Sequence, residues 1–487
     1  MTITAQPANL FSSIHDLVRM AFPGYELGEG RTDREEGHID LALVEIDGRL
    51  AADGAICLDG KTTTASQFYE LSQNSSLKYW ARVFIYRLIC RHLGQNFNPY
   101  GILTGVRPLK IVHRWLDEGW DPQVIKRNLK EQYLLTDSKA DLLVETARNN
   151  HPFLLSRQAA RKQLSLYIGI PFCPSRCHYC SFPGAVLKDY QQDMEPYINA
   201  LLLEMNQVGD YLSAAGWQVQ SIYLGGGTPT VLTDNHLQRI FEVLYHKYIS
   251  PATEEITMEA GRPDTLSPGR MRKLRQAGVT RICINPQTMN DDTLRRVGRR
   301  HSADLVIAAV AWARTAGIKH INMDLIAGLP GEEGKQIEKS VLQVLQLHPD
   351  NITVHTLAVK RGSLLAATGG KAHNPDVTAV VEEGVGICDR LIRLAGYHPY
   401  YLYRQKYMRA GLENTGYTKP GCACRFNIQM MEERQTIVGL GGGASSKFVN
   451  PSDWTLTVLH NPKDPGSYIK AVERLSARKV DKLRALN

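Results

Sequence analysis

The chain has 487 residues and a formal net charge of +8 at pH 7, and its 43% hydrophobic and 22% charged residues are ordinary for a globular protein of two or three domains. No apolar run approaches the ~20 residues that cross a bilayer, and the first residues lack a secretory-signal pattern, so we expect a cytoplasmic protein without a membrane span. We expect no nucleic acid among its partners. The mild positive charge suits an acidic small-molecule substrate, although a solvated basic surface has the same composition.

Residues 1–155 predict an α+β domain, in which no motif indicates a role. Two alternating runs, Ile39–Ile46 and Arg49–Leu58, are joined through Asp47-Gly48, which predicts a hairpin. Helices are expected around Leu10–Met20, over roughly Ala65–Leu93, and twice more in the segment up to Leu155.

In residues 156–396 the sequence predicts a strand, a loop and a helix in this order, six times in succession. The predicted strands are Ser165–Ile170, Ser221–Leu224, Glu255–Glu259, Arg281–Asn285, His320–Ile326 and Ile352–Ala358. This alternation predicts a parallel sheet with right-handed crossovers, and therefore an α/β fold built as a partial (β/α)6 barrel. In barrels of this class the reactive site lies at the carboxyl ends of the strands.

Residues 397–487 form a third part, rich in Tyr and Gly, with its tightest turn predicted at Gly439–Ser446. We expect this C-terminal region to cover the mouth of the barrel and the substrate. We also expect the protein to act as a monomer.

The first predicted strand runs into a loop with three closely spaced cysteines, Cys173, Cys177 and Cys180. The Cys-x3-Cys-x2-Cys spacing gathers three thiolates around one centre and leaves a position open, as in a cubane cluster whose fourth iron binds a small molecule. Two other interpretations stay open at this point. His178 can complete a Cys3His zinc site, and free cysteines are often simply core residues.

The other six cysteines do not suggest a disulfide scaffold in so long a chain. Cys57, Cys90, Cys283 and Cys388 lie singly in apolar surroundings and are most simply core residues. Cys422 and Cys424 form a Cys-x-Cys in a Gly-rich stretch and have no predicted role.

The cysteine loop resembles that of the radical S-adenosylmethionine (SAM) superfamily. The surrounding YIGIPFC, Tyr167–Cys173, is similar to the oxygen-independent coproporphyrinogen III dehydrogenase family. The blocks NPYGILTGVRP (98–108), YYLYRQKY and ENTGYT (400–418) resemble its HemZ-type branch. The likeness therefore extends over most of the chain.

The resemblance implies a [4Fe-4S] cluster on Cys173, Cys177 and Cys180, with SAM on the open iron and Tyr167 reaching over the cluster. These four residues are the implied catalytic group. Backbone amides of a glycine turn can approach a ligand closely. The residues implied in SAM binding are Tyr167, Gly226, Gly227, Thr228, Glu259, Gln287, Arg299, Asp324 and Ala358.

Particular contacts are implied for several of these positions. The glycine turn resembles the one that receives the SAM amino group, and Glu259 is expected at the ribose or the amino group. Arg299 is expected to pair with the SAM carboxylate as a two-pronged donor. Asp324 is expected at the ribose hydroxyls, and the backbone around Ala358 at the adenine.

The resemblance implies oxidative decarboxylation of two propionates of coproporphyrinogen III to the vinyl groups of protoporphyrinogen IX, in haem biosynthesis. A 5′-deoxyadenosyl radical would abstract the hydrogen, with a flavodoxin or ferredoxin as reducing partner. Cationic side chains would then meet the carboxylates of an anionic tetrapyrrole. The candidates are Arg295, Arg296, Arg299, Arg300, Arg404 and Lys406.

One position departs from the family. Its proven dehydrogenases carry a fourth cysteine two residues after the third, where this chain has Phe182. The same replacement occurs in the family's haem chaperones, which bind and transfer haem. A haem chaperone and a radical SAM methyltransferase acting on a tetrapyrrole are therefore the alternative functions.

Overall fold

The structure is a computed structural model that describes residues 1–30, 37–70, 76–180, 185–359, 362–367, 375–405 and 412–486. The chain forms two compact units, Met1–Glu145 and Thr146–Asn487. The predicted three-domain ranges, 1–155, 156–396 and 397–487, stay predictions.

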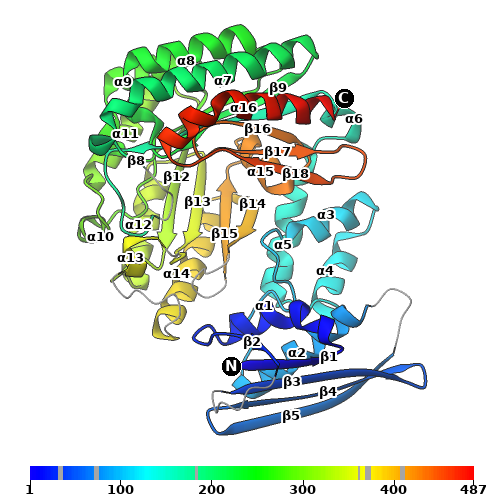
Figure 1. Ribbon diagram of the computed structural model, residues 1–487. Helices are drawn as coiled ribbons and strands as arrows, with labels where there is room; N and C mark the ends of the chain where they lie inside the picture. The colour runs from blue at the N-terminus through cyan, green and yellow to red at the C-terminus, as the bar shows by residue number, and fades with distance from the viewer. Residues whose placement is uncertain are drawn as a thin grey trace. The chain divides into compact units, whose positions relative to one another are not determined.

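The N-terminal unit is a five-stranded sheet, in the order β2-β1-β3-β4-β5, that packs against α1 and α2 (Figure 1). Its main elements are β1 (Thr2–Gln6), α1 (Phe11–Ala21), β2 (Gly28–Glu29), β3 (His38–Ile46), β4 (Arg49–Leu58), β5 (Lys61–Glu70) and α2 (Leu77–Leu93). The predicted hairpin is confirmed, because β3 and β4 pair antiparallel and both Asp47 and Gly48 have positive φ.

The helix predicted over Ala65–Leu93 is wrong over residues 65–70. Lys61–Glu70 is strand β5, paired with β4 from Leu58↔Lys61 to Arg49↔Glu70. Its threonine-rich sequence suits a half-exposed strand. The helix begins only at Leu77, where the Ser76 side chain accepts a hydrogen bond from the Tyr79 amide.

The segment beyond α2 contains three α-helices where two were predicted. They are α3 (Leu109–Asp117), α4 (Pro122–Glu131) and α5 (Asp137–Asn150). Asp121 separates α3 from α4, because its carboxylate caps the Gln123 amide and Pro122 occupies the first turn of α4.

The larger unit contains a sheet of 11 strands among the described residues, in the order β14-β15-β13-β12-β11-β10-β9-β6-β16-β17-β18. The six predicted parallel strands are confirmed as β6 (Gln163–Ile170), β9 (Gln218–Gly226), β10 (Glu255–Glu259), β11 (Arg281–Cys283), β12 (His320–Ala327) and β13 (Asn351–Thr356). β11 and β13 end two residues before their predicted ends. The partial (β/α)6 fold class is confirmed.

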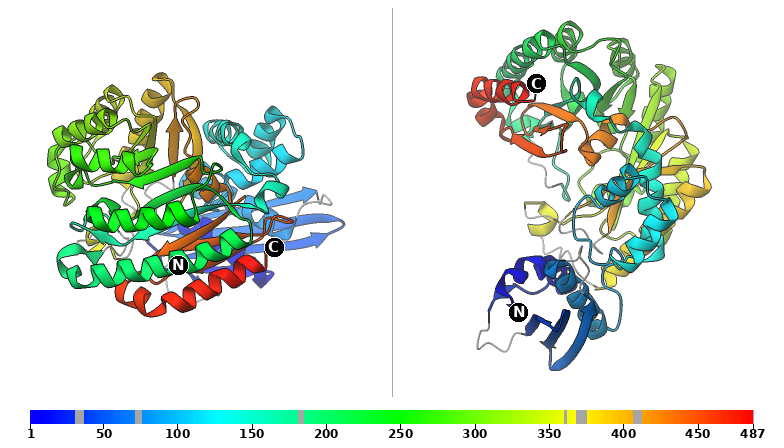
Figure 2. Two further views of the ribbon diagram at one scale, coloured as in Figure 1. Left: turned by 90° about the horizontal axis from the view of Figure 1, so that it is seen from above. Right: turned by 90° about the vertical axis from the view of Figure 1, so that its right-hand side faces the viewer.

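Helices between these strands cover the outer face of the sheet (Figures 1 and 2). They are α7 (Met194–Ala214), α8 (Asp234–Lys247), α9 (Pro268–Gln276), α10 (Asp291–Arg296), α11 (Ala303–Thr315), α12 (Gly334–Gln346) and α14 (Pro375–Leu394). On β6 the alternate residues Leu164, Leu166, Ile168 and Ile170 share one face, and all four are fully buried in the core that includes these helices.

The C-terminal part extends the sheet at both edges. β15 (Glu413–Thr418) pairs antiparallel with β13, and β14 (His398–Arg404) pairs antiparallel with β15. At the other edge β16 (Thr436–Gly441) runs parallel beside β6 and is followed by the antiparallel strands β17 (Ser445–Val449) and β18 (Leu456–His460). Between these groups lies α15 (Arg425–Glu432). That this part covers the substrate stays a prediction.

A buried ion pair fastens the last helix, α16 (Pro465–Arg484), to α7. Lys479 and Glu204 are both fully buried and in contact. Glu204 also accepts hydrogen bonds from the Gly441 amide and the Tyr468 hydroxyl, each at 2.7 Å. The predicted glycine turn is thereby fixed to the helix that follows the cysteine loop.

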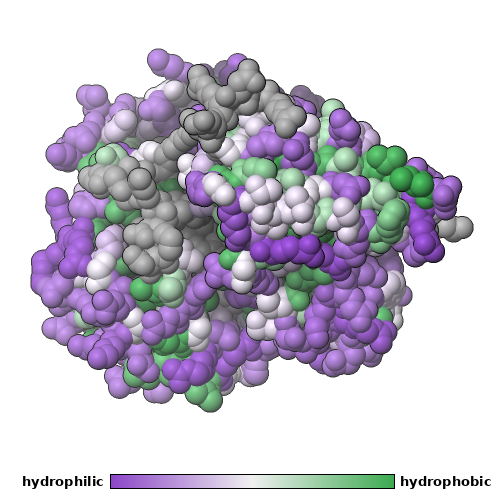
Figure 3. Space-filling view, turned by 90° about the horizontal axis from the view of Figure 1, so that it is seen from below, coloured by the Kyte–Doolittle hydropathy of each residue, from purple (hydrophilic) through white to green (hydrophobic). Residues whose placement is uncertain are grey.

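Among the described residues, no helix is both long and apolar enough to cross a membrane. The face drawn in Figure 3 is mostly hydrophilic, with apolar residues in small groups. Scattered apolar residues are normal on a folded protein's surface.

Candidate active site

The three predicted cysteines line one cavity of about 420 Å³ inside the larger unit. The loop that holds them leaves β6, passes through the short strand β7 (Phe172–Cys173), and closes with a hydrogen bond from the Cys180 amide to the Cys177 carbonyl. Thr228 Oγ1 lies 3.7 Å from Cys173 Sγ. Burial raises the pKa of the Cys173 thiol to about 11, so a metal must displace its proton.

The three sulfurs do not lie as close together as a single zinc ion would require. Zinc bound by three thiolates at ~2.3 Å would bring the sulfurs to about 3.8 Å from one another. Among the described residues, one group of three His, Cys, Asp or Glu brings its ligand atoms within 4.8 Å of one another, and it is not the cysteine trio. His178 does not join the cysteines either, because its Nδ1 lies 2.9 Å from the Arg296 carbonyl and it does not line the cavity.

The glycine turn after β9 packs directly against the cysteine loop. The amides of Gly227 and Thr228 donate to the carbonyls of Ile170 and Phe172, at 2.7 and 2.8 Å. A Cβ on Gly227 would lie 2.5 Å from the Phe172 carbonyl oxygen, and Gly226 has a φ of +111°. Any other residue at these positions would push the turn away from the cysteines.

Glu259, at the end of β10, accepts a hydrogen bond from the Gly226 amide at 2.9 Å. Burial raises its pKa to about 7, and the Gly226 hydrogen bond opposes this shift. The carboxyl group is therefore close to half ionised at neutral pH. A donor on a bound ligand, such as an ammonium or a hydroxyl, would favour its ionised form.

Asp324, in β12, also faces the cavity. Its Oδ1 accepts a hydrogen bond from Asn322 Nδ2 at 2.7 Å, and its Oδ2 lies 3.4 Å from His355 Nε2. The carboxylate is thus oriented by its neighbours and remains at the wall of the cavity.

Two buried acceptors in the cavity wall have no hydrogen-bond partner among the described residues. They are Asn285 Oδ1 and Gln287 Oε1. The backbone of Gln287 is held at a φ of +69°, with its amide donating to the Asp324 carbonyl at 2.9 Å. An unpaired buried acceptor costs about 1–3 kcal/mol, so both side chains are suited to accept hydrogen bonds from a polar ligand.

Arg299 lines the cavity, but its guanidinium is already engaged by protein groups. It donates to the Tyr179 hydroxyl at 2.9 Å, to the Asn285 carbonyl at 2.9 Å, and to the Gly261 carbonyl. In the structure Arg299 therefore braces the loops around the cavity. The contact predicted with the SAM carboxylate requires it to exchange these partners.

The structure brings nearly all predicted residues together. Those that line the cavity are Cys173, Cys177, Cys180, Gly226, Gly227, Thr228, Glu259, Gln287, Arg299, Asp324 and Ala358. Tyr167 does not line it; its ring stacks with Tyr223 and Phe426, at centroid distances of 6.0 and 6.1 Å. The role predicted for Tyr167 over the cluster has no support from this position.

Most of the predicted cationic partners lie elsewhere. Arg295 pairs with Asp292, Arg296 donates to the Pro330 carbonyl at 2.7 Å, and Arg300 lines a different groove. Arg404 is buried and does not line the cavity. Lys406 and Phe182 lie outside the described residues.

Sequence reasoning missed three residues of the site. Arg262 is 4% exposed, and its guanidinium lies 3.7 Å from Cys177 Sγ while bonding to Ser175 and Asp264. The other two are Asn285 and His355. Asn285 ends a predicted strand, Arg262 follows one, and His355 lies inside one, so a position toward the carboxyl edge of the sheet is the available signal.

The two cysteines without a predicted role lie near the amino ends of the strands. Cys424 is buried, lines the deep end of the cavity and donates to Glu255 Oε1 at 3.1 Å. Cys422 lies near His320 and Asp350.

Comparisons with known proteins agree with this geometry. The profile of the radical SAM superfamily matches residues 167–344. The solved structure of coproporphyrinogen III oxidase (HemN) from Escherichia coli, described as a radical SAM enzyme, covers 66% of this chain and 72% of its own, with a TM-score of 0.52 and 23% identity. The protein has the radical SAM fold and, as in that superfamily, uses a [4Fe-4S] cluster and SAM.

Two relatives narrow this class. The oxygen-independent coproporphyrinogen-III oxidase-like protein HemZ from Bacillus subtilis is 33% identical over 486 residues, which cover 98% of this chain and 96% of the relative. The chain belongs to this HemZ-type family. It is also similar to the heme chaperone HemW from Escherichia coli, at 30% identity over 64% of this chain and 79% of that protein.

Proposed function

We propose that the protein is a radical SAM oxidoreductase that decarboxylates two propionates of coproporphyrinogen III to vinyl groups, giving protoporphyrinogen IX. The observation that carries the proposal is the single cavity that unites the three cysteines with the unpaired polar side chains at the strand ends. The near full-length similarity to HemZ supports the tetrapyrrole substrate.

Cys173, Cys177 and Cys180 would hold the cluster, and with SAM bound it would supply radical chemistry that can remove hydrogen from an unactivated carbon. The residues of the chain position the partners of that reaction. Asn285, Gln287 and Glu259 offer acceptors to SAM, and the glycine turn keeps it against the cysteine loop. Tyr223, Tyr401 and Tyr403 also line the cavity and offer apolar ring surface to a tetrapyrrole, which would shield the reacting carbon from water.

Product analysis under strict anaerobiosis tests this proposal. Protein loaded with its cluster is incubated with SAM, a reductant and coproporphyrinogen III, and the porphyrinogen is analysed by mass spectrometry. We expect two losses of carbon dioxide, each with one methionine and one 5′-deoxyadenosine. Each round also releases one substrate electron, which an added acceptor must take up.

The second candidate function is that of a haem chaperone in the same family. The similarity to HemW and the replacement of the fourth cysteine by Phe182 favour it. Stable haem binding without substrate-dependent SAM cleavage would select the chaperone, whereas a methylated tetrapyrrole would identify a methyltransferase.

The proposal includes an acidic electron donor, such as a flavodoxin or ferredoxin, acting on a cytoplasmic monomer. A groove of about 1060 Å³ lies against the cysteine loop on the side of Pro174 and Ser175, and Arg176, Lys188, Arg295 and Arg300 line it. The opposite charges of an acidic donor and this basic groove would accelerate their association in a salt-dependent way.

Joint replacement of Lys188 and Arg300 by Glu should slow SAM cleavage driven by flavodoxin about tenfold at low salt, and leave cleavage driven by dithionite unchanged. Equal slowing with both reductants would refute docking in this groove.

A further inference from the structure

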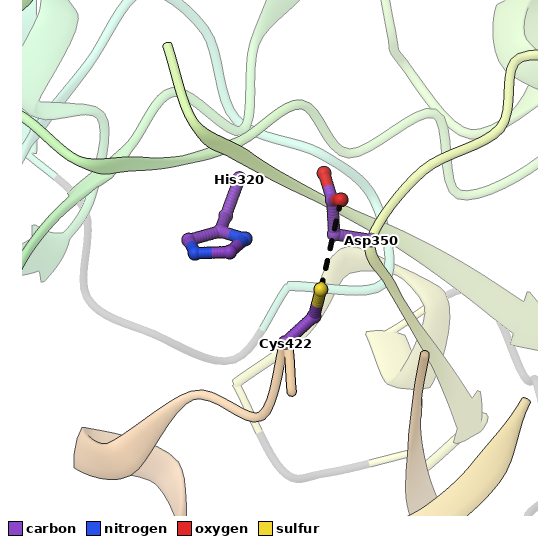
Figure 4. A group of neighbouring side chains, drawn as sticks. All are labelled: His320, Asp350 and Cys422. Carbon is purple, nitrogen blue, oxygen red and sulfur yellow. Dashed lines mark hydrogen bonds between the residues drawn. The ribbon is translucent and has the colours of Figure 1, made fainter. Parts of the chain in front are cut away.

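Three metal-binding side chains converge at the amino ends of two neighbouring strands, at the opposite end from the glycine turn (Figure 4). His320 is the first residue of β12, Asp350 directly precedes β13, and Cys422 lies in the segment between β15 and α15. One ligand atom of each lies within 4.8 Å of those of the other two, and no other trio in the described part of the chain meets this condition.

His320 offers a free ring nitrogen. Its Nδ1 is buried and has no hydrogen-bond partner among the described residues. A neutral imidazole is the form that binds metals.

Asp350 has one oxygen engaged and one directed toward the cysteine. Its Oδ2 accepts hydrogen bonds from Arg314 Nη2 at 2.9 Å and from the Ile321 amide at 2.8 Å. Its Oδ1 lies 3.9 Å from Cys422 Sγ, a separation at which a thiol hydrogen bond is weak. A metal ion can therefore take the Oδ1 and the sulfur without displacing Arg314.

We propose that His320, Asp350 and Cys422 bind a zinc ion, with water as the fourth ligand. The set of one nitrogen, one carboxylate oxygen and one thiolate sulfur suits Zn²⁺, whereas Mg²⁺ and Ca²⁺ prefer oxygen ligands alone. The carboxylate and the thiolate together balance the charge of the ion. A thiol gives up its proton when it binds zinc, so metal binding at Cys422 releases one proton.

Zinc at this site would hold in place the segment around Cys422 and Cys424, which contributes to the lining of the active-site cavity. The Cys422 carbonyl accepts hydrogen bonds from Arg281 Nη2 at 3.0 Å and from Asn351 Nδ2 at 2.9 Å. Two residues further on, Cys424 lines the cavity and bonds to Glu255. Zinc at Cys422 ties this segment to β12 and β13, so its role is structural and independent of the substrate proposed above.

Metal analysis of protein already loaded with its cluster tests the proposal, because the active-site thiolates are then occupied by iron. After equilibration with buffered zinc and gel filtration, we expect about one zinc per chain in addition to the cluster iron. Cys422→Ser should lose the zinc and keep the iron. Cys57→Ser, which changes an exposed cysteine of the N-terminal unit, should keep both.

Absorption spectra of the wild-type protein with cobalt in place of zinc provide an independent test of the site. A thiolate ligand produces sulfur-to-cobalt charge-transfer absorption, which we expect in the wild type and not in Cys422→Ser. Absence of bound zinc from the cluster-loaded wild type would overturn the proposal. So would bound cobalt without this absorption, or zinc retained by both Cys422→Ser and His320→Ala. Retained iron in the variants shows that they fold, and also separates this result from any failure of the proposed catalytic function.

Discussion

Two sets of buried polar groups, at opposite ends of the central strands in the larger unit, are paired in different ways. At the carboxyl end, Asn285 and Gln287 keep acceptors without partners among the described residues. Toward the amino end, Arg281 is 2% exposed and its guanidinium bonds to Glu255, to Asn351 and to the Cys422 carbonyl. Unpaired buried groups cost free energy, so Asn285 and Gln287 mark a place that a ligand completes, whereas the paired groups around Arg281 hold the barrel together.

The largest expected effect is the loss of the cluster at the carboxyl end. Cys177→Ala should lower the iron content of anaerobically reconstituted protein from about four atoms per chain to near zero, and abolish SAM cleavage. Iron analysis and the absorption spectrum measure the result. Cys388→Ala is the matched control, since Cys388 is equally buried but lies in α14, away from the cavity. An unchanged iron content in Cys177→Ala would contradict the assignment of the cysteine loop.

The next largest effect is expected for the buried ion pair toward the amino ends of the strands. Arg281→Met should destabilise the protein by about 3–5 kcal/mol, because it leaves Glu255 buried without its cation. The denaturant midpoint of the cluster-loaded protein measures this change. Joint replacement of Arg281 by Met and Glu255 by Gln should recover part of the loss, because no uncompensated charge then remains. A single variant as stable as the wild type would show that the pair does not support the barrel.

Glu259 gives the carboxyl end a distinct pH dependence. Its pKa is raised from 4.5 to about 7, so the folded state binds the proton more tightly than the unfolded state. The folded state therefore loses stability as the pH rises from 4.5 through 7, by up to about 3 kcal/mol. Glu259→Gln keeps an acceptor for the Gly226 amide and removes the titration. The melting temperature of this variant, relative to wild type, should rise between pH 5 and pH 8; parallel curves would refute the shift.

Much of the fold of the larger unit could be predicted from its sequence, because strands and helices alternate regularly along this part of the chain. The six parallel strands follow from apolar runs separated by amphipathic helices, and the short spacing of the cysteines places them on one loop. The ends of the strands then bring Gly226, Glu259 and Asp324 to one cavity. Local pattern and topology are sufficient for these positions.

Other features depend on contacts between distant parts of the chain, which a local pattern does not contain. Arg299 and Arg296 both belong to one basic run, yet packing sends one to the cavity and the other to the Pro330 carbonyl. Tyr167 follows the predicted strand register, but Tyr223 and Phe426 hold its ring away from the cavity lining. Residues 65–70 belong to a predicted helix, but their pairing with β4 makes them a strand, and the local sequence pattern does not contain this pairing.

The smallest expected change in stability sharpens the comparison between the two ends most directly. Asn285→Ala should alter the unfolding free energy by less than about 1 kcal/mol, because the Oδ1 atom that it removes has no partner among the described residues. The same variant should weaken SAM binding about 5–30-fold, since a hydrogen bond worth about 1–2 kcal/mol is lost in the complex. Equilibrium dialysis with cluster-loaded protein measures the affinity. Val306→Ala, a buried change in α11 away from the cavity, is the opposite control: it should lower stability and leave SAM affinity unchanged. If Asn285→Ala behaved like Val306→Ala, the unpaired acceptor would belong to the scaffold, and the distinction between the two ends of the barrel would fail.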